Sequence, residues 1–433
     1  MNERSQPTLR EMATTWARIG ILSFGGPAAQ IALMHKIIVD EKKWLTEQQY
    51  LNALSFCMLL PGPEATQLAA YSGWRVHGVV GGLMAGLLFV VPGALIVLAL
   101  TVLYGSFGSV PLVEALFFGV KAAVLVIVIE ALLRVASRTL TVRSLWVTAV
   151  LSFIAIFFLN IPFPFIIVAA ALIGYSVSRL QKPLIVGDAA LERPVQPWTS
   201  TAGTIALWLS IWLGPLLLLA MLLGQQHVLV QLGLFFSKLA VVSFGGAYAV
   251  LSYMAQDVVA SRGWLDAGQM LDGLGLAETT PGPLILVTEF VGFLAAYQHG
   301  GNSQLLMGLL GALVALWATF VPCFLWIFAG APYVEWMLSK HGLRSALRYI
   351  TAAVVGVILN LTLWFALHVL FMEVKKVEAG WLTLWTPTLD TFDLRAALLS
   401  AVGGLLLLRW RWNIAAVLAA AATLGIVLKL SGV

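Results

Sequence analysis

The chain has 433 residues, of which 60% are hydrophobic and only 10% charged, and its formal net charge is +5. Soluble globular proteins carry roughly 25% charged residues, so this composition excludes a protein with an ordinary water-facing surface. No basic segment interleaved with aromatic residues is present, which argues against nucleic-acid binding. The sequence therefore predicts an all-α polytopic membrane protein.

Apolar stretches that suit membrane-spanning helices recur along the chain. Six lie near residues 12–32, 48–74, 79–103, 114–134, 144–160 and 163–179. A polar linker from Gln181 to Thr201 follows, and then one more apolar segment near 203–224. Another six lie near 232–254, 268–296, 305–330, 348–371, 394–408 and 412–430. The first stretch has no small-residue cleavage site after it, so we expect it to stay as an anchor.

The two halves of the chain repeat each other. Ser23-Phe24-Gly25-Gly26 recurs as Ser243-Phe244-Gly245-Gly246, and Pro61-Gly62-Pro63 recurs as Pro281-Gly282-Pro283, each 220 residues later. Between positions 18 and 63, fifteen of forty-six residues are identical at this offset. We therefore predict a first repeat over 1–180, a polar linker with an extra helix over 181–224 and a second repeat over 225–433.

The extra apolar segment makes the number of spans between the repeats odd, so the second repeat should be inverted in the membrane. Two inverted repeats of about six helices are an architecture of secondary transporters. Fifteen basic residues fall in segments that this topology places in the cytoplasm and six in outer loops, which favours a cytoplasmic N-terminus and a periplasmic C-terminus. The loop that holds Lys36, Lys42 and Lys43 departs from this pattern. It leaves open whether the first motif segment spans the membrane or is re-entrant.

The repeated glycine and proline motifs predict broken helices. A helix that breaks inside a membrane needs partners in protein or in a water-filled cavity, and its free N–H groups and positive dipole end suit an anion. We expect the four breaks to meet near the midplane and to form an anion site. The alternative is that the glycines only allow close helix packing and the prolines only kink the helices.

Cations accompany both glycine motifs. Arg18 precedes Ser23 by five residues and Lys238 precedes Ser243 by five. A basic residue within a span is costly unless it faces a cavity or a partner, so the pair predicts counter-charges for a bound anion. Ser23, Ser243 and the N–H groups of the two glycine pairs would then donate hydrogen bonds. The alternative is that each cation extends to the membrane interface.

Carboxylates near the Pro-Gly-Pro motifs are candidates for coupling or gating. Glu64 follows the first motif directly, Glu278 precedes the second by three residues, and Glu289 lies six residues beyond it. An apolar environment favours the protonated form of such groups, so one of them could carry a coupling proton. The alternative is a structural ion pair with Arg18, Lys238 or Lys121. Lys121 is a second-tier coupling or gating candidate. It is a possible structural partner of Glu130 on the same predicted helix, although nine residues are too far apart for direct contact along one helix.

Other chemistries find little support. The six histidines show no metal-ligand spacing, and there is no phosphate-binding Walker loop and no nucleophile–base constellation. The sequence thus predicts neither an enzyme nor a cofactor or metal site, so energy for transport would come from an ion gradient or from exchange. Cys57 and Cys323 lie in apolar sequence and are expected to be buried small hydrophobic residues.

The motifs together resemble the bacterial chromate ion transporter family in its long, duplicated form. The stretches that carry the resemblance are FGGPAAQIALMH, LPGPEATQLAAYSGWRVHG and GGLMAGLLFVVPG, and it covers about residues 10–430. It implies a carrier in the bacterial inner membrane that exports chromate and confers resistance, driven by the membrane potential, a proton gradient or anion exchange. Sulfate should compete, because both are tetrahedral dianions of similar size.

Family motifs carried over to this sequence fall on Phe24, Gly25, Gly26, Pro27, Gln30, Pro61, Gly62, Pro63, Glu64, Gln67, Tyr71, Trp74, Phe244, Gly245, Gly246, Pro281, Gly282 and Pro283. Gln67 joins the gating candidates on this basis. The second repeat departs from the pattern, with Ala247 after Gly-Gly and Leu284 after Pro-Gly-Pro, so the two halves need not contribute equally. A carrier or exchanger for sulfate or another oxyanion and an anion channel are the alternatives, and the sequence leaves open whether the chain forms a homodimer.

Overall fold

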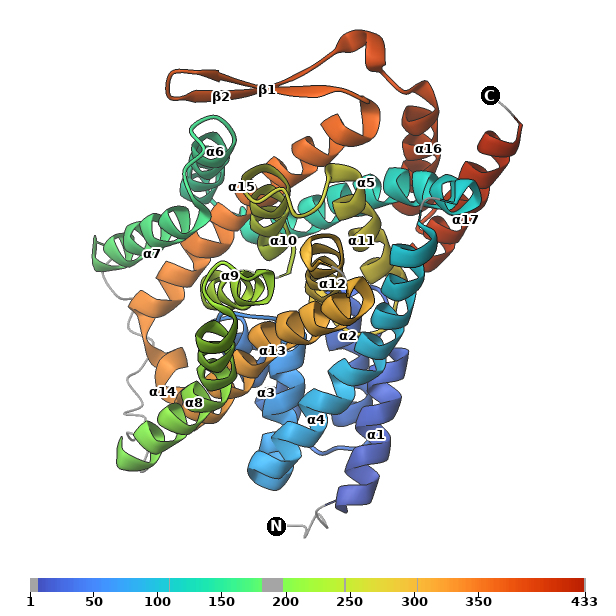
Figure 1. The fold of residues 1–433 in the computed structure, drawn as a ribbon. Coiled ribbons are helices and arrows are strands. Elements are labelled where there is room, and N and C mark those ends of the chain that lie inside the picture. Colours follow the sequence, from blue (N-terminus) through green and yellow to red (C-terminus); the bar gives the residue numbers. More distant parts are fainter. Residues whose placement is uncertain (1–6, 109, 181–197, 245–246, 302, 432–433) are drawn as a thin grey trace. The chain divides into compact units, whose positions relative to one another are not determined.

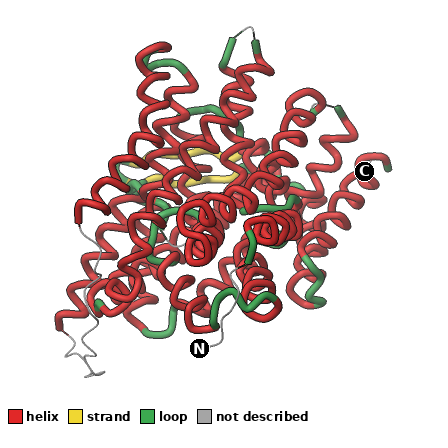
Figure 2. The backbone as a smooth tube through the Cα atoms, turned by 90° about the horizontal axis from the view of Figure 1, so that it is seen from below, coloured by secondary structure: helices red, strands yellow, loops and turns green. Residues whose placement is uncertain are grey.

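The computed structural model describes residues 7–108, 110–180, 198–244, 247–301 and 303–431. These residues are almost entirely helical, with one two-stranded sheet (Figure 2). The chain divides into two compact units, and each takes segments from both repeats. Unit 1 comprises Met1–Thr101, Pro183–Ala247 and Thr280–Leu343, and unit 2 comprises Val102–Lys182, Tyr248–Thr279 and Arg344–Val433. The compact units interleave the two repeats, whose boundaries stay a prediction from the sequence.

Unit 1 contains the first part of each repeat and the linking helix (Figure 1). Its elements are α1 (Leu9–Leu22), α2 (Gly26–His35), η1 (Lys36–Glu41), α3 (Glu47–Cys57), α4 (Glu64–Phe107, as far as Thr101), α8 (Trp198–Leu223), α9 (Val228–Val242), η3 (Leu284–Leu286), α12 (Val287–His299), α13 (Gln304–Gly330), η4 (Ala331–Tyr333) and α14 (Val334–Ser339). The glycine motifs and the Pro-Gly-Pro motifs of both repeats all fall in this unit.

The prediction of broken helices is confirmed. The stretch expected near 12–32 is two helices, α1 and α2, with a break at Ser23–Gly25. The stretch near 48–74 divides at Pro61-Gly62-Pro63 into α3 and the start of α4. In the second repeat, α9 ends before Ser243 and α12 follows the second Pro-Gly-Pro motif. Helix α4 itself is interrupted at His77 and Gly78, whose φ is 57°, so its two parts match α12 and α13.

The two repeats also share their local stop and start signals. Thr46 and Gln49 form a capping box at the start of α3, and Asp266 and Gln269, each 220 residues later, exchange the same two hydrogen bonds before α11 (Ala267–Thr279). A short side-chain acceptor before the helix and a glutamine three residues on satisfy N–H groups that the first turn cannot pair. The duplication therefore extends from the sequence to hydrogen bonds.

Packing within unit 1 depends on small residues. Gly292 on α12 and Gly311 on α13 face each other so closely that a Cβ on Gly311 would lie 2.2 Å from the Gly292 carbonyl oxygen. Gly20 on α1 meets α4 in the same way, with 2.2 Å between a Cβ placed on it and the Leu88 carbonyl oxygen. Membrane helices associate through such backbone contacts because lipid offers no hydrophobic driving force between them.

Unit 2 contains the remaining elements. They are α5 (Pro111–Thr139), α6 (Arg143–Phe157), α7 (Phe163–Leu180), α10 (Ala247–Gln256, from Tyr248), η2 (Asp257–Ser261), α11, α15 (His341–Leu370, from Arg344), β1 (Val374–Ala379), β2 (Leu382–Pro387), η5 (Leu389–Thr391), α16 (Leu394–Gly404), η6 (Leu405–Arg409) and α17 (Ile414–Leu430). Helix α5 packs along α17 and also contacts α16 and α11. Gly119 allows the closest approach, since a Cβ there would meet the Ala421 carbonyl.

The sheet in unit 2 is an antiparallel hairpin that the sequence analysis treated as an outer loop. Strands β1 and β2 pair from Val374 opposite Pro387 to Ala379 opposite Leu382, and Gly380 in the turn has a φ of 66°. Each strand has only six residues, and two isolated strands of that length are marginal without further packing. The backbone N–H of Thr383 donates to the Phe158 carbonyl oxygen at 2.7 Å, which ties the hairpin to the end of α6.

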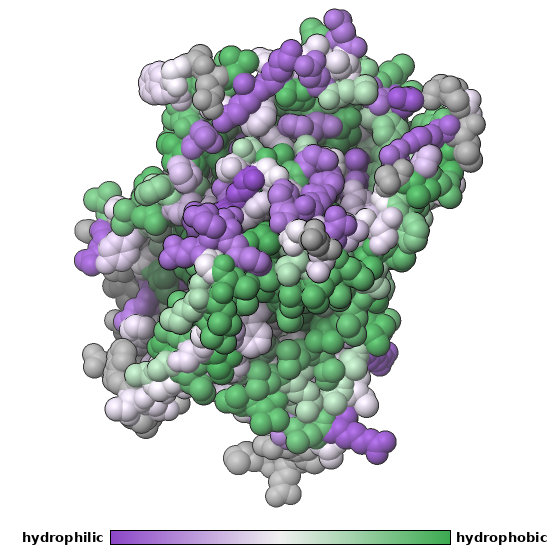
Figure 3. Space-filling view, in the orientation of Figure 1, coloured by the Kyte–Doolittle hydropathy of each residue, from purple (hydrophilic) through white to green (hydrophobic). Residues whose placement is uncertain are grey.

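The surface is that of a multi-pass membrane protein. Six helices in the described part of the chain are long and apolar enough to cross a membrane, and shorter apolar helices accompany them. The linking helix α8 leaves large apolar side chains uncovered, with Met221 81% and Leu222 71% exposed. Apolar residues cover much of the face in Figure 3. Contiguous apolar surface on this scale fits lipid and not water.

Candidate functional site

The glycine motifs end their helices with the same backbone geometry in both repeats. Ser23 follows α1 with φ −80° and ψ 74°, and Ser243 follows α9 with φ −79° and ψ 76°. In the first repeat, Gly25 then adopts a left-handed conformation with φ 85°, and α2 begins at Gly26. Gly245 and Gly246 lie outside the described residues. Both serine carbonyls are therefore turned out of their helices at equivalent places.

Each Pro-Gly-Pro motif binds the glycine motif of the other repeat. The N–H of Gly62 donates to the carbonyl oxygen of Ser243 at 2.9 Å, and the N–H of Gly282 donates to that of Ser23 at 2.8 Å. Since Gly282 and Ser243 are the repeat equivalents of Gly62 and Ser23, the two bonds exchange places when the repeats are exchanged. Such reciprocal contacts are the mark of a twofold relation. We call this arrangement of the four motifs in unit 1 the crossing.

Glycine is required at the centre of the crossing. Gly62 has a φ of 114° and Gly282 a φ of 98°, a region that other residues enter only with strain. In each repeat, the residue that follows the proline inside the next long helix packs against one of these two glycines. Gly93 on α4 lies against Gly282, and its equivalent Cys323 on α13 lies beside Gly62. Both cysteines of the chain are buried and carry free thiols.

Two buried glutamines hold the crossing from within the first repeat. Gln30 on α2 donates through Nε2 to the Gly282 carbonyl oxygen at 2.6 Å and points the same nitrogen at the Ser23 carbonyl oxygen at 3.4 Å. Gln67 on α4 donates to the Pro61 carbonyl oxygen at 2.6 Å. Because both targets are carbonyls, only the amide nitrogen can face them. The equivalents of Gln30 and Gln67 are Val250 and Val287, so this support is not duplicated.

The serine hydroxyls are engaged inside their own helices. Ser23 Oγ donates to the Ile19 carbonyl oxygen at 2.6 Å, and Ser243 Oγ donates to the Ala240 carbonyl oxygen at 3.2 Å. A hydroxyl has one proton to donate, so neither serine can donate to a ligand in this conformation. Their role as ligand donors stays a prediction that requires these two bonds to open.

The two cations lie on exposed faces of their helices. Helix α1 buries Met12, Trp16 and Ile19, and Arg18 projects from another face with its side chain 61% exposed and 4.0 Å from Glu41. Lys238 is likewise exposed on α9. Phe24 is 45% exposed. The structure thus places the prolines, Gly62 and Gly282 of the two Pro-Gly-Pro motifs in the buried crossing, and it places Arg18 and Lys238 outside it.

The predicted carboxylates have different surroundings. Glu289 on α12 is 1% exposed, and its Oε2 has no hydrogen-bond partner among the described residues. Glu278, in unit 2, is 5% exposed and accepts a hydrogen bond from the Tyr248 hydroxyl at 2.8 Å. Glu64 begins α4 and is half-buried. The structure pairs Arg18 with Glu41 and Lys121 with Asp272, and not with these three carboxylates.

The expected pairing of Lys121 with Glu130 is wrong. Glu130 instead binds Arg134, one helical turn further along α5, as residues four apart on a helix can do and residues nine apart cannot. Lys121 pairs with Asp272 on α11, with 3.3 Å between Nζ and Oδ2. Asp272 was not among the residues predicted from the sequence. Its signal was a lone carboxylate in the apolar stretch MLDGLGLA.

The described residues contain no group of three or more His, Cys, Asp or Glu that could hold a metal ion. What the crossing offers a ligand is backbone. Pro27 removes one N–H from the first turn of α2, and no side chain of the described residues caps this turn, which begins at Gly25 and Gly26. The positive end of a helix dipole and such amides suit an anion without regard to its central atom.

Comparison with known proteins decides the family. The model of the chromate transporter family matches residues 10–175 and 230–426, which are the two repeats. The chain belongs to the chromate transporter family. Within this family, a probable chromate transport protein of Synechococcus elongatus is 32% identical over 81% of this chain and 83% of its own length. A chromate transport protein of Pseudomonas aeruginosa is 32% identical over 80% of this chain and 79% of its own.

A shorter relative matches only part of this chain. An uncharacterized transporter of Bacillus subtilis is 30% identical over 158 residues, which are 36% of this chain and 88% of the relative. No solved structure gave a significant match. For this family member, the duplication seen in the sequence, the reciprocal crossing in unit 1 and the paired family matches agree with one another.

Proposed function

We propose that this chromate transporter family member is a secondary carrier that exports chromate across the bacterial inner membrane, with the crossing as the centre of its anion site. The observation that carries the proposal is the reciprocal pair of bonds between Gly62 and Ser243 and between Gly282 and Ser23. Helix breaks at membrane depth are tolerated only where they meet protein or line a water-filled cavity, and here they are duplicated and tied together.

The crossing suits a tetrahedral dianion on chemical grounds. The amides of Gly25 and Gly26 and the dipole of α2 supply partial positive charge, and Arg18 and Lys238 would supply whole charges from the flanking helices. The two cations lie at equivalent places, one in each repeat, and reach the ligand only if the crossing opens toward them. We therefore propose that alternating access consists of opening and closing around the two serine–glycine bonds. Nothing in this chemistry is particular to chromium, so sulfate should compete.

The first test is transport by membrane vesicles of known orientation. Inside-out vesicles accumulate what cells export, so respiring inside-out vesicles that contain the wild-type chain should take up chromate, and right-side-out vesicles should not. Uptake of sulfate without chromate would replace the cargo, and uptake only by right-side-out vesicles would reverse the direction. An electrical current that corresponds to far more than the roughly thousand turnovers per second of a fast enzyme would point to a channel.

A second test addresses the site. Gly62→Ala forces a side chain into a backbone region with φ 114°, where a Cβ would lie 2.9 Å from Gln67 Nε2, and it should abolish uptake. Gly203→Ala on α8 is the matched control, because a Cβ there meets nothing within 4 Å. Equal uptake by the two variants, at equal amounts of inserted protein, would remove the crossing from the proposed site.

A further inference from the structure

A buried ion pair lies in unit 2, apart from the duplicated motifs. Asp272 on α11 is 4% exposed. Its Oδ2 accepts a hydrogen bond from the Tyr104 hydroxyl at 2.7 Å and lies 3.3 Å from Lys121 Nζ. Its Oδ1 has no partner among the described residues. Both partners thus share one oxygen and leave the other oxygen of a buried carboxylate without a hydrogen bond, which is costly and calls for an explanation.

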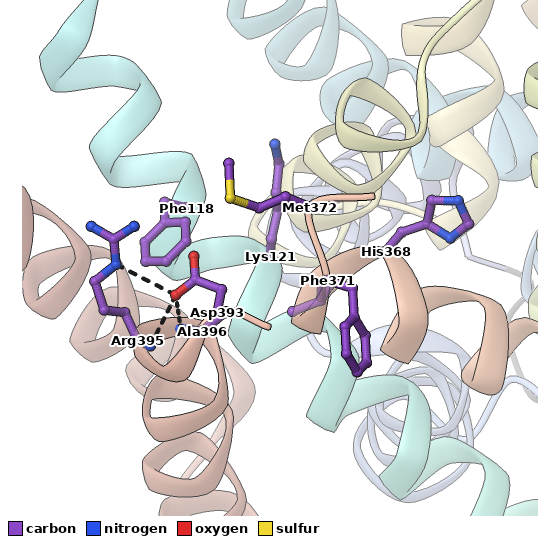
Figure 4. Close-up of a pocket in the computed structure, with 9 residues that line it drawn as sticks. Phe118, Lys121, His368, Phe371, Met372, Asp393, Arg395 and Ala396 are labelled. Atoms are coloured by element: carbon purple, nitrogen blue, oxygen red, sulfur yellow. Dashed lines mark hydrogen bonds and ion pairs between the residues drawn. The ribbon is translucent and has the colours of Figure 1, made fainter. Parts of the chain in front are cut away.

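Lys121 connects this carboxylate to a pocket. Its side chain is 29% exposed and lines a pocket of about 320 Å³. The other lining residues come from α5, from the end of α15 and the residues after it, and from the start of α16: Phe118, His368, Val369, Phe371, Met372, Asp393, Arg395 and Ala396. Figure 4 shows Lys121 rising beside Met372, with Arg395 and Asp393 paired on the other side. The pocket lies at the base of the hairpin, whose Lys375 and Lys376 belong in water. Water can therefore reach the Lys121 end of the pair.

Close packing holds the pair in place. A Cβ on Gly268 would lie 3.0 Å from Lys121 Nζ, and a Cβ on Gly275 would lie 2.2 Å from Val120. Two glycines two turns apart on α11 thus let α5 approach closely and leave room for the ammonium group. Lys121 cannot leave Asp272 by a shift of the helices without a loss of this packing, but its flexible stem can move between the carboxylate and the pocket.

The pair has no equivalent in the other repeat. The residues that correspond to Asp272, Lys121 and Tyr104 are Asn52, Thr351 and Val334, and Asn52 accepts a hydrogen bond from Gln48, one turn earlier on α3. Features that bind the same ligand from two sides are duplicated, as the crossing is. A charged pair that is present in one repeat alone is not part of the duplicated features of the crossing. It suits a step that has to differ between the two directions of transport.

We propose that Asp272 and Lys121 form the proton-coupling site of the carrier. In this scheme Oδ1 of Asp272 takes up one proton by way of the pocket, the neutral carboxyl releases the Lys121 ammonium toward the pocket, and loss of the proton restores the pair. Each cycle thus moves one proton on and off one carboxyl group. The role of this site in transport rests on the proposed function, whereas the protonation of Asp272 does not depend on it.

The other titratable groups around Asp272 are few. Tyr104 from α4 donates a hydrogen bond to it, Lys121 from α5 pairs with it, and Asp266 precedes its own helix. Helix α17, which also packs against α11, carries one charged residue, Lys429, and Glu114 of α5 binds that lysine. Asp272 is therefore the carboxylate in this group whose proton uptake would change the pairing of Lys121.

The experiment compares Asp272→Asn, Asp272→Glu and Glu130→Gln with the wild-type protein in proteoliposomes. Glu130→Gln is the matched control, because it removes the carboxylate that pairs with Arg134 on α5, the helix that also carries Lys121. A pH-sensitive dye in the lumen reports proton movement when chromate is added. We expect Asp272→Asn to lower this proton movement at least about tenfold, Asp272→Glu to retain much of it, and Glu130→Gln to match the wild type.

Infrared difference spectra of the purified protein between high and low pH test the protonation step without any cargo. A carboxylic-acid band that titrates in the wild type and is missing in Asp272→Asn supports the proposal. Its persistence in that variant, or chromate-linked proton movement that survives the substitution, overturns it. If the wild type moves no chromate at all, the proposed function fails, and the infrared band still decides whether Asp272 exchanges a proton.

Discussion

Replacing Gly93 by alanine tests the crossing through a residue whose own backbone is an ordinary helix. Gly93 lies in α4, where alanine would by itself stabilise the helix by about 0.5–1 kcal/mol. A Cβ at this position, however, would lie 2.3 Å from the Pro281 carbonyl oxygen and 2.9 Å from the Gly282 Cα. These are backbone atoms, so they cannot rotate away as a side chain would. The motif has to move by about 1 Å to reach ordinary contact distance.

The size of the effect follows from two contributions. Overpacking of a close contact costs about 1–3 kcal/mol. A shift of that size also lengthens the bond from Gly282 to Ser23, now 2.8 Å, and a lost backbone hydrogen bond costs about 0.5–1.5 kcal/mol. Together they outweigh the gain in helix propensity and leave a net loss of roughly 1–4 kcal/mol. We expect Gly93→Ala to lower the thermal midpoint of the purified protein and to reduce chromate uptake at least about tenfold.

Gly203→Ala supplies the contrast, because the same substitution on α8 meets no atom within 4 Å and should leave uptake unchanged and the midpoint equal or higher. Cys323→Ala, at the repeat equivalent of Gly93, makes the side chain smaller and should cost less than Gly93→Ala. If the Gly93→Ala and Gly203→Ala variants have the same thermal midpoint and the same chromate uptake, then Pro281-Gly282-Pro283 does not pack against α4 at Gly93.

Three further predictions concern other parts of the chain. Gln30→Met removes the donor to the Gly282 carbonyl oxygen and should lower stability by about 1–3 kcal/mol in a chemical or thermal melt, whereas Gln231→Met at a partly exposed position should change little. Arg18→Ala and Lys238→Ala should each weaken chromate uptake by raising the half-saturating concentration, and uptake kinetics identical to wild type in both would remove them as counter-charges. The pKa of Glu373 is held below its ordinary value by Lys375, so its contribution to the hairpin is present at neutral pH and is lost as the pH falls through that lowered pKa. Hydrogen exchange of β1 should then be faster at acid pH than the change in intrinsic rate explains, and Glu373→Gln should abolish this excess.

The duplication in the sequence predicted most of the element pattern. Because Ser23 and Ser243 stand in equivalent apolar settings, both breaks could be placed within a residue or two, and the Pro-Gly-Pro breaks with them. The partner of each break could not be read from the chain, since the pattern does not say whether Gly62 meets its own repeat or the other one. That information lies in long-range packing and has no local signal.

Charged residues were harder to assign than helix breaks. Lys121 was matched with Glu130 because both lie on one helix, but a lysine side chain reaches only its own turn or a neighbouring helix, and the neighbour proved to be α11. Arg18 was expected beside the break because it is near Ser23 in sequence. Its direction depends on which face of α1 is buried, and Met12, Trp16 and Ile19 fix that face away from it. The hairpin was not predicted, because two strands of six residues each are a weak signal beside long apolar helices.

The bonds of the crossing can form only late in the synthesis of the chain. The Ser23 carbonyl and the Gly62 amide leave the ribosome long before Gly282 and Ser243, the residues that satisfy them. At about 5–20 residues per second, the wait is roughly ten to fifty seconds. During that time the first repeat must enter the bilayer with broken helices whose polar groups lack their final partners, so it needs shelter from the insertion machinery or from lipid headgroups. A chain that holds only one repeat never receives those partners from itself and has to obtain them from a second molecule.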